Sequence, residues 1–314
     1  MCIIADNVKD VSKTKIACFH VGFAFDGEKS VFPAQLTVYS ANIDSQTSTN
    51  ALILPIFNPG NNPKKIIPLD FSLGSDFFDD LEMIYSKWFG QEIRNKFYFT
   101  NCFDEKNDCK LDVYTVGDYK FSIMPSKLDF NRLDRTQLNI NPTSKNSIDM
   151  HNNDYSFIVY QFYQKGKIDI TPFGYLLECN INDQNLMVPT IHGHPHDNLI
   201  TGISFQPYAD ASYNSGFEET AHYDHEIYAL TKDNENFIAI ESQNLLKSVS
   251  SDVLAINQLL KKINMDYMKR KIRLYVPKKF IPYKIKIKNF EKNRNSIICK
   301  NNFTFINDLI IDLK

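Results

Sequence analysis

Residues 15 to 25 read KIACFHVGFAF, a run of apolar, β-branched and aromatic side chains. The turn-forming stretch DGEKS follows it directly. A run of this composition with Asp and Gly at its end predicts a β-strand. Most of the chain repeats every two residues rather than every 3.6, so this segment is typical of the whole sequence and indicates a protein built mainly from strands.

Similar runs recur at hairpin spacing, separated by clusters of Asn, Asp, Gly and Pro. The clearest hairpin is DVYTVGDYKFSIM (112 to 124), in which Gly117 and Asp118 can supply the positive φ angles of a tight turn. The segment NDQN (182 to 185) predicts a second hairpin. The other expected strands are CIIADNV (2 to 8), QLTVYSANI (35 to 43), ALILPIF (51 to 57), YSFIVYQFY (155 to 163), FGYLLECNI (173 to 181) and LMVPTIH (186 to 192).

Two segments instead have the periodicity of a helix. In GSDFFDDLEMIYSKWFG (74 to 90), Ser75 can cap free backbone N–H groups, Asp76 and Asp79 suit the positive end of the helix dipole, and Gly90 suits the position after the helix. A second helix is expected from about Ser251 through residue 271, because apolar residues recur there at i, i+3 and i+4. Strands and helices together predict an α+β protein of mainly antiparallel β-sheets with two main helices packed on them.

The chain has 314 residues, 43% of them hydrophobic, and can therefore bury a sizeable core. A single compact unit over residues 1 to 314 is favoured. The alternative is a division into a β-rich part, residues 1 to 145, and a second part, residues 154 to 314, because the run TSKNSIDMHNN (143 to 153) is polar and aperiodic. That run would be either a boundary or an ordinary surface loop.

The first ten residues, MCIIADNVKD, meet a charge at Asp6, and no window approaches the roughly eighteen uninterrupted apolar residues of a spanning helix. We therefore expect no signal peptide and no membrane span. The expected compartment is the cytoplasm or, for a viral chain, the virion or host cytoplasm. The six cysteines form no CxxC pair, which favours reduced thiols, although Cys102 and Cys109 could form a bridge in an oxidising compartment.

Five of the seven histidines fall within 34 residues, in two separate segments. The first is VPTIHGHPHDN (188 to 198). If residues 188 to 194 continue as a strand, His192 and His194 project from one face, while Pro195 ends the strand and leaves His196 in the turn. Imidazoles placed in this way can bind one metal ion through their ring nitrogens.

The second segment, HYDHEIYAL (222 to 230), carries three polar groups ahead of an apolar run. A metal site could combine the first two histidines with either His225 or the pair His222 and Asp224. Three such ligands with an open position suit Zn²⁺ or Fe²⁺ and can activate a bound water. The candidate ligands are then His192, His194, His225 and His222, with Asp224 or Asp197 as general base or orienting group.

A purely structural role is the alternative for these histidines. At a polar rim of a sheet they would form hydrogen bonds with the backbone and with Asp197, Asp210 or Glu218, and an HxH pair alone is a weak motif. The segment HGHPHD is similar to the HxHxDH element of metallo-β-lactamase-like hydrolases, but its last two residues are reversed and the strand–helix alternation around that element is missing.

Cys2 offers a different chemistry. Removal of Met1 would expose its α-amino group, whose pKa of about 8 allows it to act as base to the thiol. Over little more than the first twenty residues the chain resembles N-terminal-nucleophile hydrolases, which implies Cys2 as nucleophile and Asp26 as the match to an Arg or Asp after the second strand. A retained Met1 blocks this mechanism, and Cys2 would then be a small apolar residue that opens a buried strand.

The charge of the chain is unevenly distributed. Residues 261 to 300 contain fourteen Lys or Arg against two acidic residues, about +12, whereas the whole chain has a formal charge of −2. Within this segment Lys284, Lys286 and Lys288 alternate with apolar residues and would line one strand face. The pattern is typical of a protected edge strand. A basic surface for nucleic acid or another anionic partner is the functional alternative.

A set of phrases within about residues 1 to 230 is distinctive: MCIIADNVKDVSKTKI, QLTVYSANI, NALILPIFNP, DFFDDL, VGDYKFSIMPS with DFNRLD, VPTIH and HYDHEIYAL. Together they resemble a family of bacterial, protist and viral proteins that begin Met-Cys and have no assigned reaction. The resemblance implies a shared fold in which His192, His194 and His225 recur. This family has an arginine where Ala34 stands and a histidine where Thr171 stands, so the chain lacks two polar groups that could serve a site.

The sequence thus leaves three functional hypotheses. A metal-dependent hydrolase-like enzyme that uses the histidines is favoured. The alternatives are a non-enzymatic binding or structural protein that docks an anionic partner through residues 261 to 300, and an N-terminal-nucleophile amidohydrolase that uses Cys2.

Overall fold

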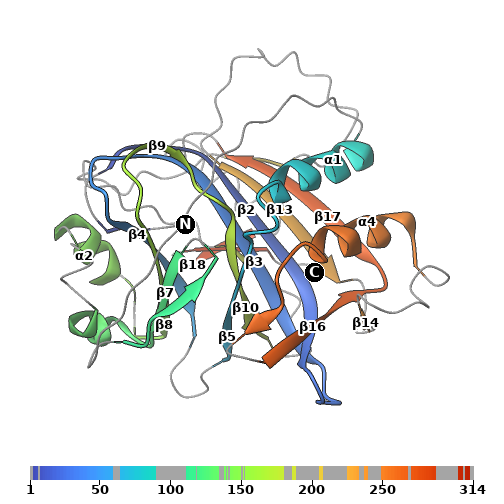
Figure 1. Cartoon of the computed structure of the whole chain (residues 1–314). Helices are drawn as coiled ribbons and strands as arrows, with labels where there is room; N and C mark the ends of the chain where they lie inside the picture. Colours follow the sequence, from blue (N-terminus) through green and yellow to red (C-terminus); the bar gives the residue numbers. More distant parts are fainter. Residues whose placement is uncertain are drawn as a thin grey trace, which may run out of the picture.

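Figure 1 shows the computed structural model of the chain. The structure describes residues 3–5, 8–58, 64–89, 111–117, 119–133, 138, 140, 142–149, 151, 153–179, 186–188, 205–207, 225–232, 237–239, 249–267, 270–287, 303–306 and 308–311. Within these residues the protein consists mainly of strands, with few helices, and most strand pairs are antiparallel. The prediction of a β-rich, mainly antiparallel α+β protein is confirmed at this level.

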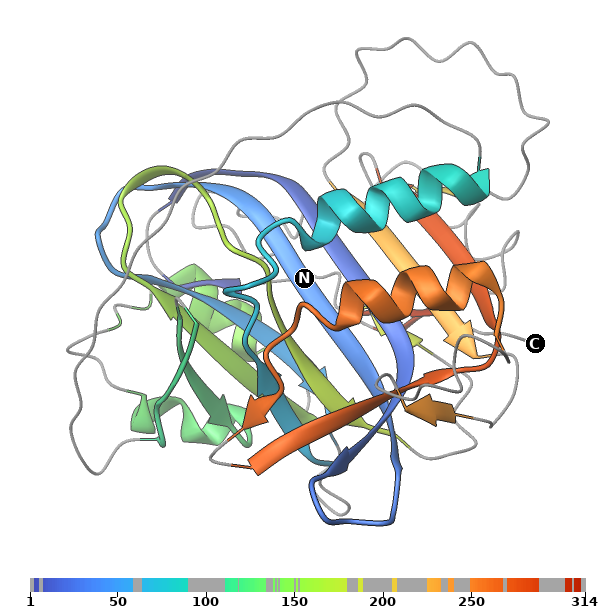
Figure 2. The same ribbon diagram turned by 45° about the vertical axis from the view of Figure 1, so that its right-hand side comes forward.

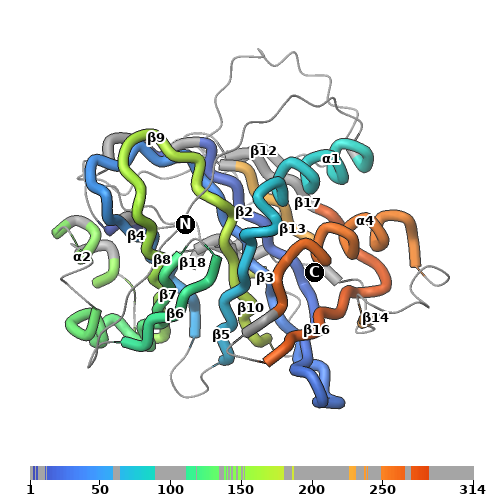
Figure 3. Tube along the Cα trace, in the orientation of Figure 1, coloured from blue at the N-terminus to red at the C-terminus, as the bar shows by residue number. Residues whose placement is uncertain are grey.

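The described strands form three sheets, and the largest contains eleven strands. Its main path runs β12 (Phe205–Pro207), β17 (Phe280–Ile287), β13 (His225–Lys232), β2 (Val8–Phe25), β3 (Phe32–Ser45), β10 (Phe173–Glu178) and β5 (Ile66–Leu69). The remaining strands of this sheet are β9 (Gly166–Asp169), β14 (Phe237–Ala239), β15 (Asp266–Tyr267) and β16 (Arg270–Pro277). Strands β2 and β3 are the longest of the sheet and run through its centre (Figure 3).

The second sheet has five strands in the order β1 (Ile3–Ile4), β4 (Asn50–Phe57), β8 (Tyr155–Phe162), β7 (Tyr119–Met124) and β6 (Tyr114–Val116). The predicted hairpin between the last two strands is confirmed, because β6 pairs with β7 and Gly117 between them has a φ of +57°. The third sheet contains β11 (Leu186–Val188), β19 (Asp308–Ile311) and β18 (Phe303–Ile306).

Strand β2 has a different buried cluster on each face, because successive side chains of a strand point to opposite sides. Ile16 and Cys18 pack with residues of the five-stranded sheet, such as Tyr160. Ala17 and Phe19 belong to a second cluster that contains the buried residues of two helices. The large sheet is therefore the middle layer, with the five-stranded sheet on one face and helices on the other (Figure 1).

The helical layer consists of α1 (Phe77–Phe89) and α4 (Ser251–Leu260), which lie side by side over the sheet (Figure 2). Ser250, the residue before α4, caps the helix because its side chain accepts a hydrogen bond from the N–H of Val253. An ion pair connects the end of α4 with the start of α1. Lys262 Nζ, two residues after α4, lies 3.0 Å from Asp76 Oδ2 and also contacts Asp80.

The predicted extension of the second helix to residue 271 is wrong. Helix α4 ends at Leu260, and the chain then continues into β15 and β16. Strand-type hydrogen bonds account for the difference: the N–H of Asn264 donates to Asp70 O at 2.9 Å, and the N–H of Ile272 donates to Met265 O at 2.8 Å. Apolar side chains such as Ile263 continue the helical spacing but are buried as part of a turn.

Most of the polar run 143 to 153 forms an α-helix, α2 (Pro142–Asp149), so its prediction as a surface loop is wrong. Proline suits the first position of a helix, and Ser144 and Ile148 are buried. At the other end, Lys127 Nζ donates to the carbonyls of Asp149 at 3.3 Å and His151 at 2.8 Å. These contacts with carbonyls at the end of the helix stabilise a segment that has little apolar periodicity.

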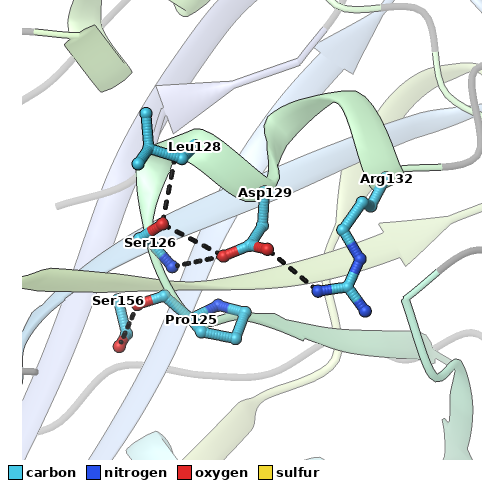
Figure 4. A network of polar contacts seen from close by, with 6 residues as sticks. All are labelled: Pro125, Ser126, Leu128, Asp129, Arg132 and Ser156. Atoms are coloured by element: carbon cyan, nitrogen blue, oxygen red, sulfur yellow. Dashed lines mark hydrogen bonds and ion pairs between the residues drawn. The ribbon is translucent and has the colours of Figure 1, made fainter.

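Lys127 belongs to a short 3₁₀ helix, η1 (Lys127–Arg132), which begins with a capping box (Figure 4). The side chain of Ser126 accepts from Leu128 N at 3.2 Å, and Asp129 Oδ2 accepts from the backbone N–H of Ser126 at 3.0 Å. Arg132 contacts the other carboxylate oxygen at 2.9 Å. Partial burial alone would raise the pKa of Asp129, but the hydrogen bonds from Arg132 and Ser126 outweigh it and lower the pKa.

Two further predictions concern strands, and a third concerns the division into domains. The strand predicted over residues 2 to 8 is divided between β1 and the start of β2. The hairpin predicted at 182 to 185 is wrong, because β10 pairs with β3 and β5 whereas β11 pairs with β19. Strands on either side of residue 150 pair with each other: β2 pairs with β13 in the large sheet, and β4 pairs with β8 in the five-stranded sheet. The division into domains stays a prediction.

Among the described helices, none is both long and apolar enough to cross a membrane.

Candidate functional site at one end of the large sheet

Four adjacent strands of the large sheet meet in one row of paired residues. Thr14 of β2 pairs with His225 of β13, His225 pairs with Ile287 of β17, and Ile287 pairs with Phe205 of β12. His225 is the first residue of β13 and Phe205 is the first residue of β12. This row is the candidate functional site, because it contains one of the histidines that the sequence singled out.

The directions of these strands place two chain segments at the same end of the sheet. Strands β12 and β13 are both antiparallel to β17, so they are parallel to each other and start in the same row. Since neighbouring strands lie about 4.8 Å apart, the starts of β12 and β13 are separated by about 10 Å. His196 precedes β12 by nine residues and His222 precedes β13 by three. The chain therefore enters β12 and β13 at the same end of the sheet.

Strand β11 packs on the large sheet and precedes the first histidine segment in the chain. Leu186 of β11 is buried in the same cluster as Ile227 and Ala229 of β13. Val188, the last residue of β11, is four residues before His192 in the chain. Four residues can span at most about 14 Å. The chain thus leaves β11 from the face of the sheet on which Ile227 is buried.

Strand β2 has a β-bulge next to His225. Ser12 pairs with Asn42 and Lys15 pairs with Ser40, so three steps along β2 face two steps along β3. Lys13 has a φ of +51°, which is rare for a residue with a Cβ atom. The parallel ladder with β13 starts at the next residue, Thr14, whose side chain is buried. The bulge therefore lies where the ladder beside His225 begins.

The next row of paired residues along the strands carries charged side chains on the helix-covered face of the sheet. Lys15 pairs with Glu226, and Lys15 Nζ lies 3.6 Å from Glu82 Oε2 of α1. The hydroxyl of Tyr228 donates to Glu226 Oε2 at 2.9 Å. Burial, followed by the charges of Glu226 and Glu82, raises the pKa of Tyr228 well above its usual value. This phenol is therefore a hydrogen-bond donor and does not ionise at neutral pH.

Most of the residues proposed from the sequence as site residues lie outside the described residues. Among the residues that the structure describes, no three or more His, Cys, Asp or Glu side chains form a group that could hold a metal ion. His225 is placed by its backbone, and its pairing with two strands is given above. The residues outside are Cys2, His192, His194, His196, Asp197, His222, Asp224 and Lys288.

Two described side chains do not belong to this site. His20 is buried in β2, six positions beyond Thr14, and this separation corresponds to about 20 Å along a strand. A metal ion bound by His225 therefore has no access to His20. Cys18 is also buried, and its Sγ lies 4.0 Å from Thr37 Oγ1. Burial raises its pKa to about 12 despite the opposing contact with Thr37, so this thiol is a poor nucleophile.

The lysine-rich strand is only partly an edge strand. Lys284 pairs with Tyr228 and Lys286 pairs with Glu226, and β12 lies on the other side of residues 285 to 287. The edge-strand interpretation is therefore wrong over those residues. Basic residues elsewhere in the 261 to 300 segment contact carboxylates, as shown by Arg270 with Glu28 at 2.6 Å, Arg273 with Asp26 at 2.8 Å, and Lys262 with Asp76 and Asp80.

Sequence reasoning missed the bulge and the contacts of Glu82. The expected strands 2 to 8 and 15 to 25 leave residues 9 to 14 between them, whereas β2 runs through these residues. A short polar interruption inside an apolar alternation is a signal that could have indicated a bulge. No sequence signal brings Glu82 close to Lys15 and Tyr228, because these contacts depend on where α1 packs.

No family model matches this chain. Among solved structures, the crystal structure of baculovirus P35 can be aligned with 93% of this chain and 100% of its own, with a TM-score of 0.35 and 13% sequence identity. A similarity of this size does not define the fold or the function of the chain. The resemblance to the Met-Cys family stays a prediction.

Proposed function

We propose that this protein is a metal-dependent hydrolase-like enzyme whose metal ion is held at the end of the large sheet where β12 and β13 begin. The proposed ligands are His192, His194 and His225, and the metal is Zn²⁺ or Fe²⁺. Asp224 or Asp197 would act as general base or orient a ligand. An alternative ligand set replaces His225 by His222 and Asp224.

One observation carries this proposal. Strands β12 and β13 are parallel, flank β17 and start in the row of Phe205, Ile287 and His225. The two segments that contain the histidines precede these two strands, so the topology supports a common location for residues about thirty positions apart in the chain. The burial of Leu186 in the same cluster as Ile227 adds support, since it places β11, which precedes the first segment in the chain, on the large sheet.

The chemistry follows from the ligand set. Three protein ligands would leave a coordination position for water, and the bound ion would supply a water whose pKa is lowered to about 7. A carboxylate nearby can then accept a proton during attack on an ester, amide or phosphoester. Nothing in this set distinguishes these substrates, so the proposal specifies hydrolysis and not a particular bond.

The test is metal content together with matched histidine variants. Elemental analysis of the purified protein is expected to find about one equivalent of metal, as a single three-ligand site requires. The double variant His192→Ala/His194→Ala and the single variant His225→Ala are expected to lose it. His196→Ala is the control, because it removes a neighbouring imidazole that is not a proposed ligand. A metal-free protein whose melting temperature is unchanged by chelation would refute the proposal.

A second candidate function is docking of an anionic partner, such as nucleic acid, through residues 261 to 300, including Lys284, Lys286 and Lys288. The exposure of Lys261, Lys271 and Lys278 favours it. The ion pairs of Lys262, Arg270 and Arg273 count against it, because those cations are already engaged by carboxylates. Binding to DNA or RNA that weakens steeply with salt would support this candidate, and salt-independent or undetectable binding would exclude it.

The Cys2 hydrolase stays a third prediction, because this residue lies outside the described part of the chain. Intact-mass measurement decides it quickly. A mass that includes Met1 excludes a free α-amino group on Cys2, and with it the mechanism.

A further inference from the structure

The turn between β2 and β3 contains an aspartate followed by a glycine. Asp26 is the only aspartate in the sequence that precedes a glycine, Gly27. The N–H of Glu28 donates to Phe25 O at 3.0 Å, and this hydrogen bond closes a β-turn around the pair. Gly27 has a φ of +83°, a value that favours glycine at the third residue of a turn.

The side chain of Asp26 and the backbone of Gly27 are both accessible. The Asp26 side chain is 52% exposed, and Gly27 is exposed. A Cβ atom at Gly27 would meet no atom within 4 Å. Within the described part of the chain, no backbone carbonyl accepts a hydrogen bond from the N–H of Gly27. The peptide plane between these two residues can therefore turn without a steric clash and without losing a backbone hydrogen bond.

We propose that Asp26 is a modification site, at which the side chain isomerises to isoaspartate by reaction with the backbone of Gly27. The nitrogen of Gly27 attacks Cγ of Asp26 in its carboxylic acid form. An N–Cγ bond forms, a C–O bond of the carboxyl breaks, and the hydroxyl leaves with the amide proton as water. The product of this step is a five-membered succinimide ring.

Water then opens the ring at one of its two carbonyl carbons. Breaking the bond from the ring nitrogen to Cγ restores aspartate. Breaking the bond to the original backbone carbonyl carbon gives isoaspartate, in which the chain runs through Cγ and the α-carboxylate becomes the side group. The water lost in the first step is regained in the second, so the reaction needs no other reactant. This inference does not depend on the proposed metal site.

The contacts around the turn allow the product to persist in the folded protein. Arg273 lies 2.8 Å from the Asp26 carboxylate, and Arg270 lies 2.6 Å from the Glu28 carboxylate. Isomerisation adds a backbone atom between the two carboxylates and changes both contacts, but exposed ion pairs contribute little to stability. The N–H of Asp26, which donates to Lys271 O at 2.8 Å, is not changed by the reaction.

Asp44 provides a matched comparison within the same hairpin. It also precedes a small residue, Ser45, but it lies inside β3 and pairs with Asp10 of β2 and Lys167 of β9. Attack by the nitrogen of Ser45 first requires strand hydrogen bonds to break. We therefore expect isomerisation at Asp44 to be slower than at Asp26 by about tenfold or more.

The experiment is incubation of the full-length protein near neutral pH in heavy-oxygen water, at a temperature where circular dichroism shows it folded. Peptide mapping with electron-transfer fragmentation distinguishes isoaspartate from aspartate at each position. We expect isoaspartate at Asp26 with one heavy oxygen atom, because ring opening takes its oxygen from the solvent. Asp26→Glu keeps the charge but would require a larger ring, so it is expected to give no isomer. Asp26→Asn forms the same ring with loss of ammonia and is expected to react faster.

The same chain unfolded in urea is the reference for the effect of the fold. We expect the native rate at Asp26 to lie within about tenfold of the unfolded rate, because the turn leaves the reacting groups accessible. A larger reduction would show that the turn protects Asp26 and would overturn the inference. Equal rates at Asp26 and Asp44 in the native protein, or isoaspartate without heavy oxygen, would overturn it as well.

Discussion

At Gly174, strand β10 approaches its neighbour β3 so closely that a side chain has no room. A Cβ atom at this position would lie 2.5 Å from Thr37 O and 2.9 Å from Phe71 Cε2. Phe71 is itself buried against Phe77 of α1, with ring centroids 5.4 Å apart. Glycine is therefore required here by packing between strand, sheet and helix, although its φ is not in the left-handed region.

Gly174→Ala is accordingly expected to destabilise the protein. The methyl group must displace a backbone carbonyl, so we expect a loss of about 2 kcal/mol in the free energy of unfolding, measured with urea. Gly74→Ala is the matched control, because the nearest atom to its Cβ would be 3.7 Å away. Its expected change is within about 0.5 kcal/mol. Similar values for both variants would contradict the packing argument.

Cys18 gives a second prediction for a single residue. Burial raises its pKa to about 12, so almost no thiolate exists at pH 8 and reagents have no access to the sulfur. We expect iodoacetamide to modify Cys18 only after unfolding, whereas the partly exposed Cys179 reacts in the native protein. Peptide mapping by mass spectrometry reads both sites in one sample. Modification of native Cys18 at the rate of Cys179 would be inconsistent with this environment.

Individual elements were predictable where the signal was local. Strands β3, β4, β8 and β10 were expected from their own apolar and aromatic residues and are found within a few residues of the predicted bounds. The prediction failed where distant residues decide the outcome. Helix α4 stops because Asn264 bonds to Asp70, and α2 is stabilised at its end by Lys127. Neither partner lies near in the sequence.

The capping box of η1 gives a prediction about pH. The pKa of Asp129 is lowered in the folded protein from a value of 3.8, so its contribution to stability is present above about pH 3.8 and is lost as pH falls through the folded pKa. Asp129→Asn is expected to cost about 1 kcal/mol at pH 7, the size of a lost cap. This difference from the wild type should shrink below pH 3.8 in urea titrations.

The exposed Asp169 of β9 is the control for this experiment. Asp169→Asn should change stability little at either pH, because exposed charges in water contribute little. A difference between Asp129→Asn and the wild type that stays constant down to pH 2 or so would mean that the carboxylate charge has no part in the cap.

For the whole molecule, the fold class was predictable but the arrangement of strands was not. Alternating side chains on β2, such as Ile16 and Ala17, indicate a strand without stating which strands flank it. The parallel pairing of Thr14 with His225 joins residues more than two hundred positions apart. Such pairing depends on how two layers cover the sheet, and no local pattern encodes it.

The candidate site, like the fold, could be predicted only in part from the sequence. The sequence identified His225 and the other histidines by their unusual density, which needs no knowledge of the fold. The common start of β12 and β13 beside β17, and the bulge at Lys13, appear only once the sheet is assembled. Hence the residue types were predictable, whereas the row in which β12 and β13 both begin was not.

The central claim is that the two histidine segments meet around one metal ion at this end of the sheet. Modification by diethyl pyrocarbonate, measured for each histidine by mass spectrometry with and without Zn²⁺, tests it most directly. We predict that Zn²⁺ protects His192, His194 and His225 together, at the same concentration, and leaves His196 reactive. Protection of one segment alone, or of none of these three histidines, would contradict the claim.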